Sequence, residues 1–266
     1  MSAGPITLRR GVLAFGSGGL VGALGGLIGL GGAEFRLPLL IGLFRFPALD
    51  AVIVNKATSL VVVASALIFR SGTIPFGTIA AHWPIILNLL AGSLAGAWVG
   101  ASWAVRLRSA ALYRIIAVLL VAMAAILLFA HGTTAASAVL TGAAQMIAGV
   151  VAGFGIGVVA SLLGVAGGEL LIPTLILLFG AEIKLAGSLS LAVSLPTMLV
   201  GFARYSRDQS FSVLASNKTF VLIMAAGSLV GAFVGGLLLG VVPQAVLLPA
   251  LAGILVISAV KIWRHQ

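Results

Sequence analysis

A glycine-rich segment with a single acid and a single proline is written twice in the chain. GLGGAEFRLPLLIGLF occupies residues 29–44, and GVAGGELLIPTLILLF occupies residues 164–179, which is 135 positions further on. The same offset relates GSLAGAWVG at 92–100 to GSLVGAFVG at 227–235, where seven of nine positions are identical. Similarity that persists at one offset indicates two copies of one structural unit.

The composition indicates whether the chain folds in water or in a lipid bilayer. Hydrophobic residues make up 61% of the 266 residues and charged residues only 8%, and residues 219–260 contain no Asp, Glu, Lys or Arg. A soluble domain exposes far more charge than this. We therefore predict an all-α, polytopic helical membrane protein, with residues 1–266 in a single transmembrane domain.

Apolar stretches bounded by turn residues predict five helical segments in each repeat. Pro75, Phe76 and Gly77 mark a loop in the first repeat, which covers about 11–131, and the second repeat covers about 138–265. The predicted segments are about 11–31, 36–46, 51–69, 83–105 and 110–130, followed by 138–164, 169–180, 184–203, 217–240 and 245–263.

Two of the predicted segments, 36–46 and 169–180, are too short to cross a bilayer. Twelve helical residues cover ~18 Å, against a hydrocarbon core of ~30 Å. Broken or re-entrant helices are tolerated at membrane depth where protein or a water-filled cavity surrounds them. Such pieces at matching places in two repeats indicate a transport site at the repeat interface.

The distribution of basic residues predicts the topology. Cations cluster before the first segment, between the last two segments of repeat one, in the early loop of repeat two and at the end of the chain: Arg9, Arg10, Arg106, Arg108, Arg114, Arg204, Arg207, Lys218, Lys261 and Arg264. The turns at 131–137 and 241–245 carry no Lys or Arg. The positive-inside rule then places both termini in the cytoplasm and predicts two inverted halves, with Arg70 as an exception.

Glu34 and Glu169 occupy equivalent positions, each four residues before a proline. A carboxyl group at membrane depth is costly and usually has a functional reason, so these acids are candidates for proton coupling or for ordering the substrate site. The alternative is a structural acid in the first turn of a helix. The preceding glycines allow close approach of the backbone, and their free N–H groups would face an anion if helices begin there. These candidate anion-binding glycines are Gly31, Gly32, Gly167 and Gly168.

Arg36, Lys56 and Asn55 are the candidate anion ligands. Leu171 and Leu191 stand at the positions equivalent to the two cations, which predicts one charged site rather than two. Snorkelling of the cations to the interface is the alternative. Thr58, Ser59, Ser190 and Ser194 supply hydroxyls that face the pore or form hydrogen bonds between helices.

Several classes of function lack the residues that they need. No catalytic signature or nucleotide-binding loop is found, the chain has no Cys, and we expect neither an enzyme nor a cofactor or metal site. The net charge of +10 comes from scattered residues rather than a basic run, so no nucleic-acid partner is expected. The expected partners are a small anion and the lipid bilayer, with a proton or another ion as a coupling candidate.

The doubled acid–proline module, the segments ATSLVVV and SLSLAVS, and the two GSL motifs resemble the TauE/SafE sulfite exporter family, also called TSUP, over about 11–263. The resemblance implies a bacterial inner-membrane permease for sulfite, an organosulfonate or a related sulfur-containing anion. Two alternatives stay open: an anion channel of the same fold, and a membrane scaffold subunit that transports nothing.

Overall fold

The computed structural model describes residues 7–28, 32–70, 74–129, 138–237 and 244–264, and all regular elements in these ranges are helical. The first half contains α1 (Leu8–Ile28), α2 (Ala33–Gly42), α3 (Ala48–Arg70), α4 (Phe76–Ala81), α5 (Trp83–Ala104) and α6 (Ser109–Phe129). The second half contains α7 (Gly142–Leu163), α8 (Gly168–Phe179), α9 (Ile183–Tyr205), the 3-10 turn η1 (Gln209–Phe211), α10 (Ser212–Ser216), α11 (Lys218–Leu237) and α12 (Gln244–Trp263).

The predicted all-α fold is confirmed, and each of the ten predicted segments corresponds to one helix. The predicted loops were wrong at two places, because α4 and the η1–α10 pair lie within them. These helices have six and five residues, which is too short for a hydrophobic period to be recognised. Pro75 directly precedes α4 with a φ of −57°, a value suited to the start of a helix.

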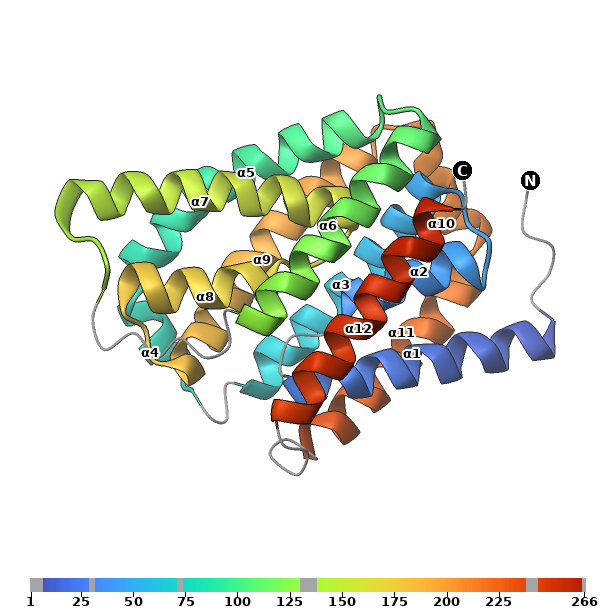
Figure 1. Ribbon diagram of the computed structural model, residues 1–266, viewed down its shortest axis with the longest axis horizontal. Helices are drawn as coiled ribbons and strands as arrows, with labels where there is room; N and C mark the ends of the chain where they lie inside the picture. Colours follow the sequence, from blue (N-terminus) through green and yellow to red (C-terminus); the bar gives the residue numbers. More distant parts are fainter. Residues whose placement is uncertain (1–6, 29–31, 71–73, 130–137, 238–243, 265–266) are drawn as a thin grey trace.

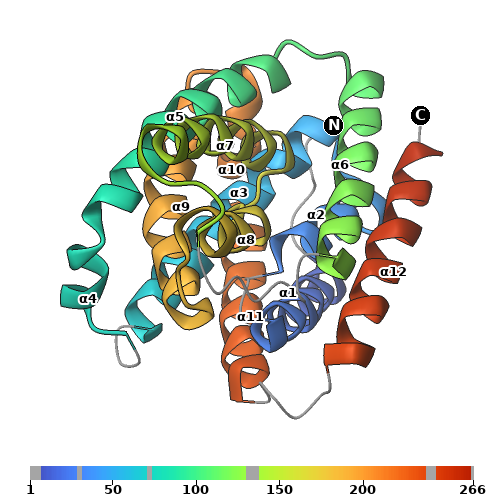
Figure 2. The ribbon, with the colours of Figure 1, turned by 60° about the vertical axis from the view of Figure 1, so that its left-hand side comes forward.

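Six of the described helices are long and apolar enough to cross a membrane: α3, α5, α6, α7, α9 and α11. Among these, α3 and α9 are the most buried inside the protein, and they pack against one another. The other helices surround them, with α6 and α12 side by side on one flank (Figures 1 and 2). The chain is therefore a multi-pass membrane protein with a central helix pair.

The short helices α2 and α8 fold back on the helices that precede them. Val139, before α7, donates a backbone hydrogen bond of 3.0 Å to the carbonyl of Leu177 near the end of α8. In the first half, the guanidinium of Arg10 in α1 lies 5.8 Å from the ring centroid of Phe46, which follows α2. Each half therefore begins with a helical hairpin, and we call residues 32–34 and 163–169 the two hairpin tips.

Contacts between the halves occur in reciprocal pairs. Helix α1 packs on α11, and its equivalent α7 packs on α5, which is the equivalent of α11. The two helices of each pair run in the same direction, because the residue numbers of their contacts rise on both helices. Gly18 lies against Met224 and Gly26 against Ala232 in the first pair, and Gly92 lies against Val150 in the second. Figure 1 shows α1 and α7 running in opposite directions across the view. Inverted repeats would produce this arrangement, and both the inversion of the halves and their orientation in a membrane stay predictions.

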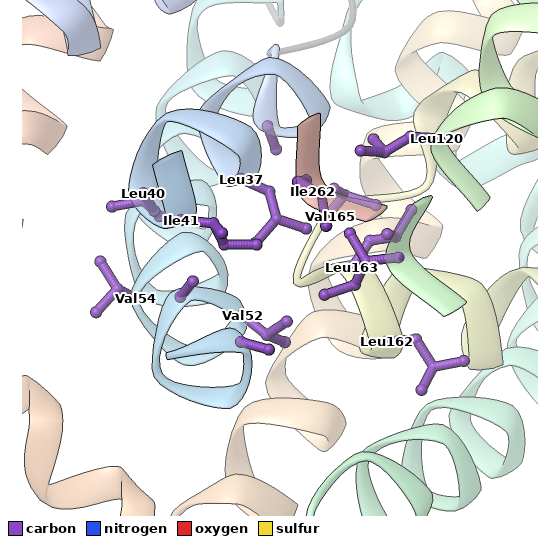
Figure 3. Packing of buried hydrophobic residues seen from close by; sticks show 14 of the residues in the cluster. Leu37, Leu40, Ile41, Val52, Val54, Leu120, Leu162, Leu163, Val165 and Ile262 are labelled. Carbon is purple, nitrogen blue, oxygen red and sulfur yellow. The ribbon is translucent and has the colours of Figure 1, made fainter. Parts of the chain in front are cut away.

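Buried aliphatic side chains join the first hairpin to the second half. Leu37, Leu40 and Ile41 of α2 belong to one cluster with Leu162, Leu163 and Val165 at and just after the end of α7 (Figure 3). Ile262 of α12 joins the same cluster. Because close packing gives little freedom to these side chains, it holds the first tip in one position against the second.

Candidate functional site

Left-handed glycines form the turns at both hairpin tips. Gly32 immediately precedes α2 with φ 69°, and Gly167 immediately precedes α8 with φ 81°. Gly164 ends α7 with φ 68°. These backbone angles cost little for glycine and are strained for other residues, which explains why glycine occupies these three turn positions. Gly31 lies outside the described residues.

Asn55 of α3 ties the two tips together. Its side-chain amide donates hydrogen bonds of 3.0 Å to the carbonyl of Ala33 at the first tip and to that of Leu163 at the second. In the other half, the Ser194 hydroxyl of α9 donates to the carbonyl of Ala166, at 2.8 Å. The central helices therefore hold both tips through hydrogen bonds to backbone carbonyls.

Arg36 of α2 lies among side-chain oxygens from two other helices. Its Nη1 donates to Asn55 Oδ1 at 3.3 Å and to Ser59 Oγ at 2.9 Å, and its Nη2 donates to Ser228 Oγ at 3.3 Å. The Nε atom has no hydrogen-bond partner in the described part of the protein. Arg36 is 0% exposed, so it does not snorkel to an interface.

Lys56, one residue after Asn55, points toward the other half. Among the described residues, its amine makes one hydrogen bond, of 3.5 Å, to the carbonyl of Ala160 in α7. Gly201 of α9 lies opposite, and a Cβ atom placed there would be 3.0 Å from Nζ and 2.9 Å from Ser161 Oγ. Lys56 is also 0% exposed, so the snorkelling alternative is excluded for both cations.

Glu34 and Glu169 meet at the contact between the tips. They are 0% and 3% exposed, and their carboxyl groups are close enough to share a side-chain hydrogen bond. No N–H or O–H group of the described residues donates to either oxygen of Glu34 or to Oε2 of Glu169. Glu34 therefore does not cap α2 through a side-chain hydrogen bond to the following turn in the described structure.

Prolines follow both acids at the same spacing. Pro38 and Pro173 lie inside α2 and α8. Because proline has no N–H group, the backbone carbonyls of Glu34 and Glu169 lack their usual helical partner four residues on. Each short helix therefore carries, on one residue, a buried carboxyl group and a backbone carbonyl without its usual donor four residues on.

The candidate hydroxyls divide into two groups. Ser59 accepts from Arg36 and Ser194 bonds to the second tip, so both connect different helices. Thr58 and Ser190 donate to the carbonyls of Val54 and Gly187 within their own helices. All four are buried, and only Ser59 and Ser194 take part in the polar cluster at the tips.

The structure therefore brings together most of the candidate residues in one polar cluster, which we define as Glu34, Arg36, Asn55, Lys56, Ser59, Glu169 and Ser194. Gly32, Gly167 and Gly168 form the adjacent tips. The cluster is closed to the surface, and the two described grooves lie elsewhere, between α1 and α11 and between α6 and α12. A cavity shared by the tips stays a prediction.

Ser228 was missed as a site residue, although the sequence carries a signal for it. It contacts Arg36 from α11 and belongs to the second GSL motif. Its equivalent, Ser93, forms a hydrogen bond of 2.7 Å with Thr197 of α9. Both repeated serines thus connect a peripheral helix to a more central one, a role that the repeat alone does not reveal.

Comparisons with known proteins agree with this architecture. The family model described as sulfite exporter TauE/SafE matches residues 8–262, nearly the whole chain. No match was found among curated proteins or among solved structures. With a family match of this length and a multi-pass helical fold built on two glycine-tipped hairpins, the chain belongs to the TauE/SafE sulfite exporter family.

Proposed function

We propose that this protein is a secondary transporter of a small anion, with sulfite, an organosulfonate or a related sulfur-containing anion as its substrate. The observation that carries the proposal is the burial of two cations without a carboxylate that accepts from either in the described structure. A buried cation that lacks a hydrogen-bonded counter-ion costs several kcal/mol, and a bound anion would offset that cost. The family match supports the sulfur-containing class of substrate.

Lys56 is the better placed of the two cations to bind the anion directly. Two of the Arg36 nitrogens already donate to three side-chain oxygens, whereas the Lys56 amine makes one hydrogen bond to the described part of the protein, at 3.5 Å. An ammonium group carries three N–H donors, so most of its capacity is unused here. The N-terminal ends of α2 and α8, with their free N–H groups, add favourable potential for an anion at the tips.

A carrier mechanism agrees better with the closed cluster than a channel does. An anion can reach Lys56 only if helices move, because the amine and its surroundings are buried.

A channel and a scaffold subunit are the competing functions. Counterflow of labelled sulfite in proteoliposomes separates them, since a carrier exchanges substrate against a gradient, a channel does not, and a scaffold shows no flux. We place the protein in a bacterial inner membrane with cytoplasmic termini and an ion gradient as its energy source.

Sulfite binding to purified protein tests the role of Lys56. We expect Lys56→Gln to weaken binding by about tenfold or more, because a hydrogen bond to a charged group contributes ~1.5–3 kcal/mol. Gly201→Ala should weaken binding as well, since its methyl group would displace the amine. Gly155→Ala is the matched control, because a Cβ atom there meets nothing within 4 Å. Unchanged affinity in both Lys56→Gln and Gly201→Ala would remove the amine from the site.

A further inference from the structure

The contact between the two hairpin tips contains a pair of acids that the anion site does not use. Glu34 and Glu169 come from equivalent positions of the two repeats, in the first turns of α2 and α8. Three of their four oxygens are buried and accept no hydrogen bond from the described N–H and O–H groups. The carboxyl groups are nevertheless within hydrogen-bonding reach of one another.

The polar side chains near the acid pair donate their hydrogen bonds to groups other than the two acids. On α2, Arg36 donates to Asn55, Ser59 and Ser228. On α3, the Asn55 amide donates to the carbonyls of the two tips, and Lys56 donates to Ala160. On α9, Ser194 donates to the carbonyl of Ala166. None of these side chains donates a hydrogen bond to either oxygen of Glu34 or to Oε2 of Glu169.

Two ionised carboxylates in contact repel strongly in a buried site, and a hydrogen bond between two carboxyl groups needs a proton on one of them. With both acids protonated, two buried cations would face no negative charge at all. One proton on the pair satisfies the hydrogen bond and leaves one negative charge near Arg36 and the positive ends of two helices. We propose that Glu34 and Glu169 bind a single proton between them, which forms a proton-binding site at the contact between the two hairpin tips.

The proton links the two halves of the protein. While it is bound, the tips are joined by a carboxyl–carboxylate hydrogen bond in addition to the bridge through Asn55. When it leaves, the two charges repel and the contact between the tips is broken. With one proton bound, Arg36 and Lys56 together exceed the acids by one positive charge, and loss of the proton removes this excess. The same proton would thereby favour both the closed tips and a bound anion.

Infrared spectroscopy of the purified protein in lipid tests the proposal without any transport measurement, so its failure is distinguishable from failure of the proposed function. We expect the wild type at neutral pH to show the carbonyl band of one protonated carboxyl group per chain. Glu34→Gln and Glu169→Gln should each abolish the whole band, because a glutamine amide can donate to the remaining carboxylate and no proton is needed. Glu182→Gln, at an exposed carboxyl group before α9, is the control and should leave the band unchanged.

Three results would overturn the proposal. Absence of the band in the wild type at neutral pH means that both acids are ionised, and this result depends on no variant. A wild-type band of two carboxyl groups means that both are protonated. Retention of the band in either single variant means that the remaining acid holds a proton by itself.

Discussion

Asn55 connects more parts of the candidate site than any other described side chain of the polar cluster. It donates to one carbonyl in each hairpin tip and accepts from Arg36. We expect Asn55→Leu to lower the free energy of unfolding by about 2–4 kcal/mol, because each buried polar group left unpaired costs ~1–3 kcal/mol. Thermal unfolding in detergent measures the change.

Ser65→Ala on the same helix is the control for Asn55. Among the described residues its hydroxyl bonds to the carbonyl of Val61, one turn earlier, and to no other group, so its loss should change the unfolding free energy by less than ~0.5 kcal/mol. Equal effects of the two substitutions would show that the bridge between the tips contributes nothing to stability.

Helix pairing depends on glycines that allow two backbones to approach closely. A Cβ atom at Gly22 in α1 would overlap the carbonyl oxygen of Ser228 in α11, and one at the equivalent Gly157 in α7 would overlap that of Ser93 in α5. We expect Gly22→Ala and Gly157→Ala each to destabilise the protein by ~1–3 kcal/mol through overpacking. Their similar cost would reflect equivalent interfaces in the two halves.

Each of these helices also contains a glycine that makes no close contact. A Cβ atom at Gly16 in α1 or at Gly155 in α7 would meet nothing within 4 Å. Alanine at either place should be neutral or stabilise by ~0.5–1 kcal/mol through its higher helix propensity. Thermal unfolding compares these two variants with Gly22→Ala and Gly157→Ala. Destabilisation by Gly16→Ala and Gly155→Ala would contradict the packing argument.

The whole molecule should place the two halves in opposite orientations across the bilayer. Because the chain has no Cys, single cysteines at exposed Ser109, Thr141 and Ser206 can be labelled without further changes. We expect an impermeant maleimide added outside intact cells to label only Thr141→Cys. The other two should react only after permeabilisation, because they lie in the arginine-rich segments of the predicted cytoplasmic side. Labelling of Thr141→Cys and Ser206→Cys from the same side would exclude the predicted topology.

The sequence alone determined the membrane class, the ten main helices and the repeat, because these depend on local features: the length of apolar stretches, glycine and proline positions, and similarity at a fixed offset. It also identified Glu34, Arg36, Asn55, Lys56 and Glu169 as unusual, since charge and polarity are costly in an apolar chain. The short helices α4 and α10 escaped prediction because they are too short to show a period.

Only the tertiary structure decided which of these residues meet. The contact of Glu34 with Glu169 and the bond from Asn55 to Leu163 each join positions more than 100 residues apart in the chain. Apolar burial is not directional and cannot select such partners. Close backbone approach at glycines and hydrogen bonds of defined geometry select them instead. For the same reason the difference between Arg36, which is held by three oxygens, and Lys56, which has one long hydrogen bond, became visible only in the fold.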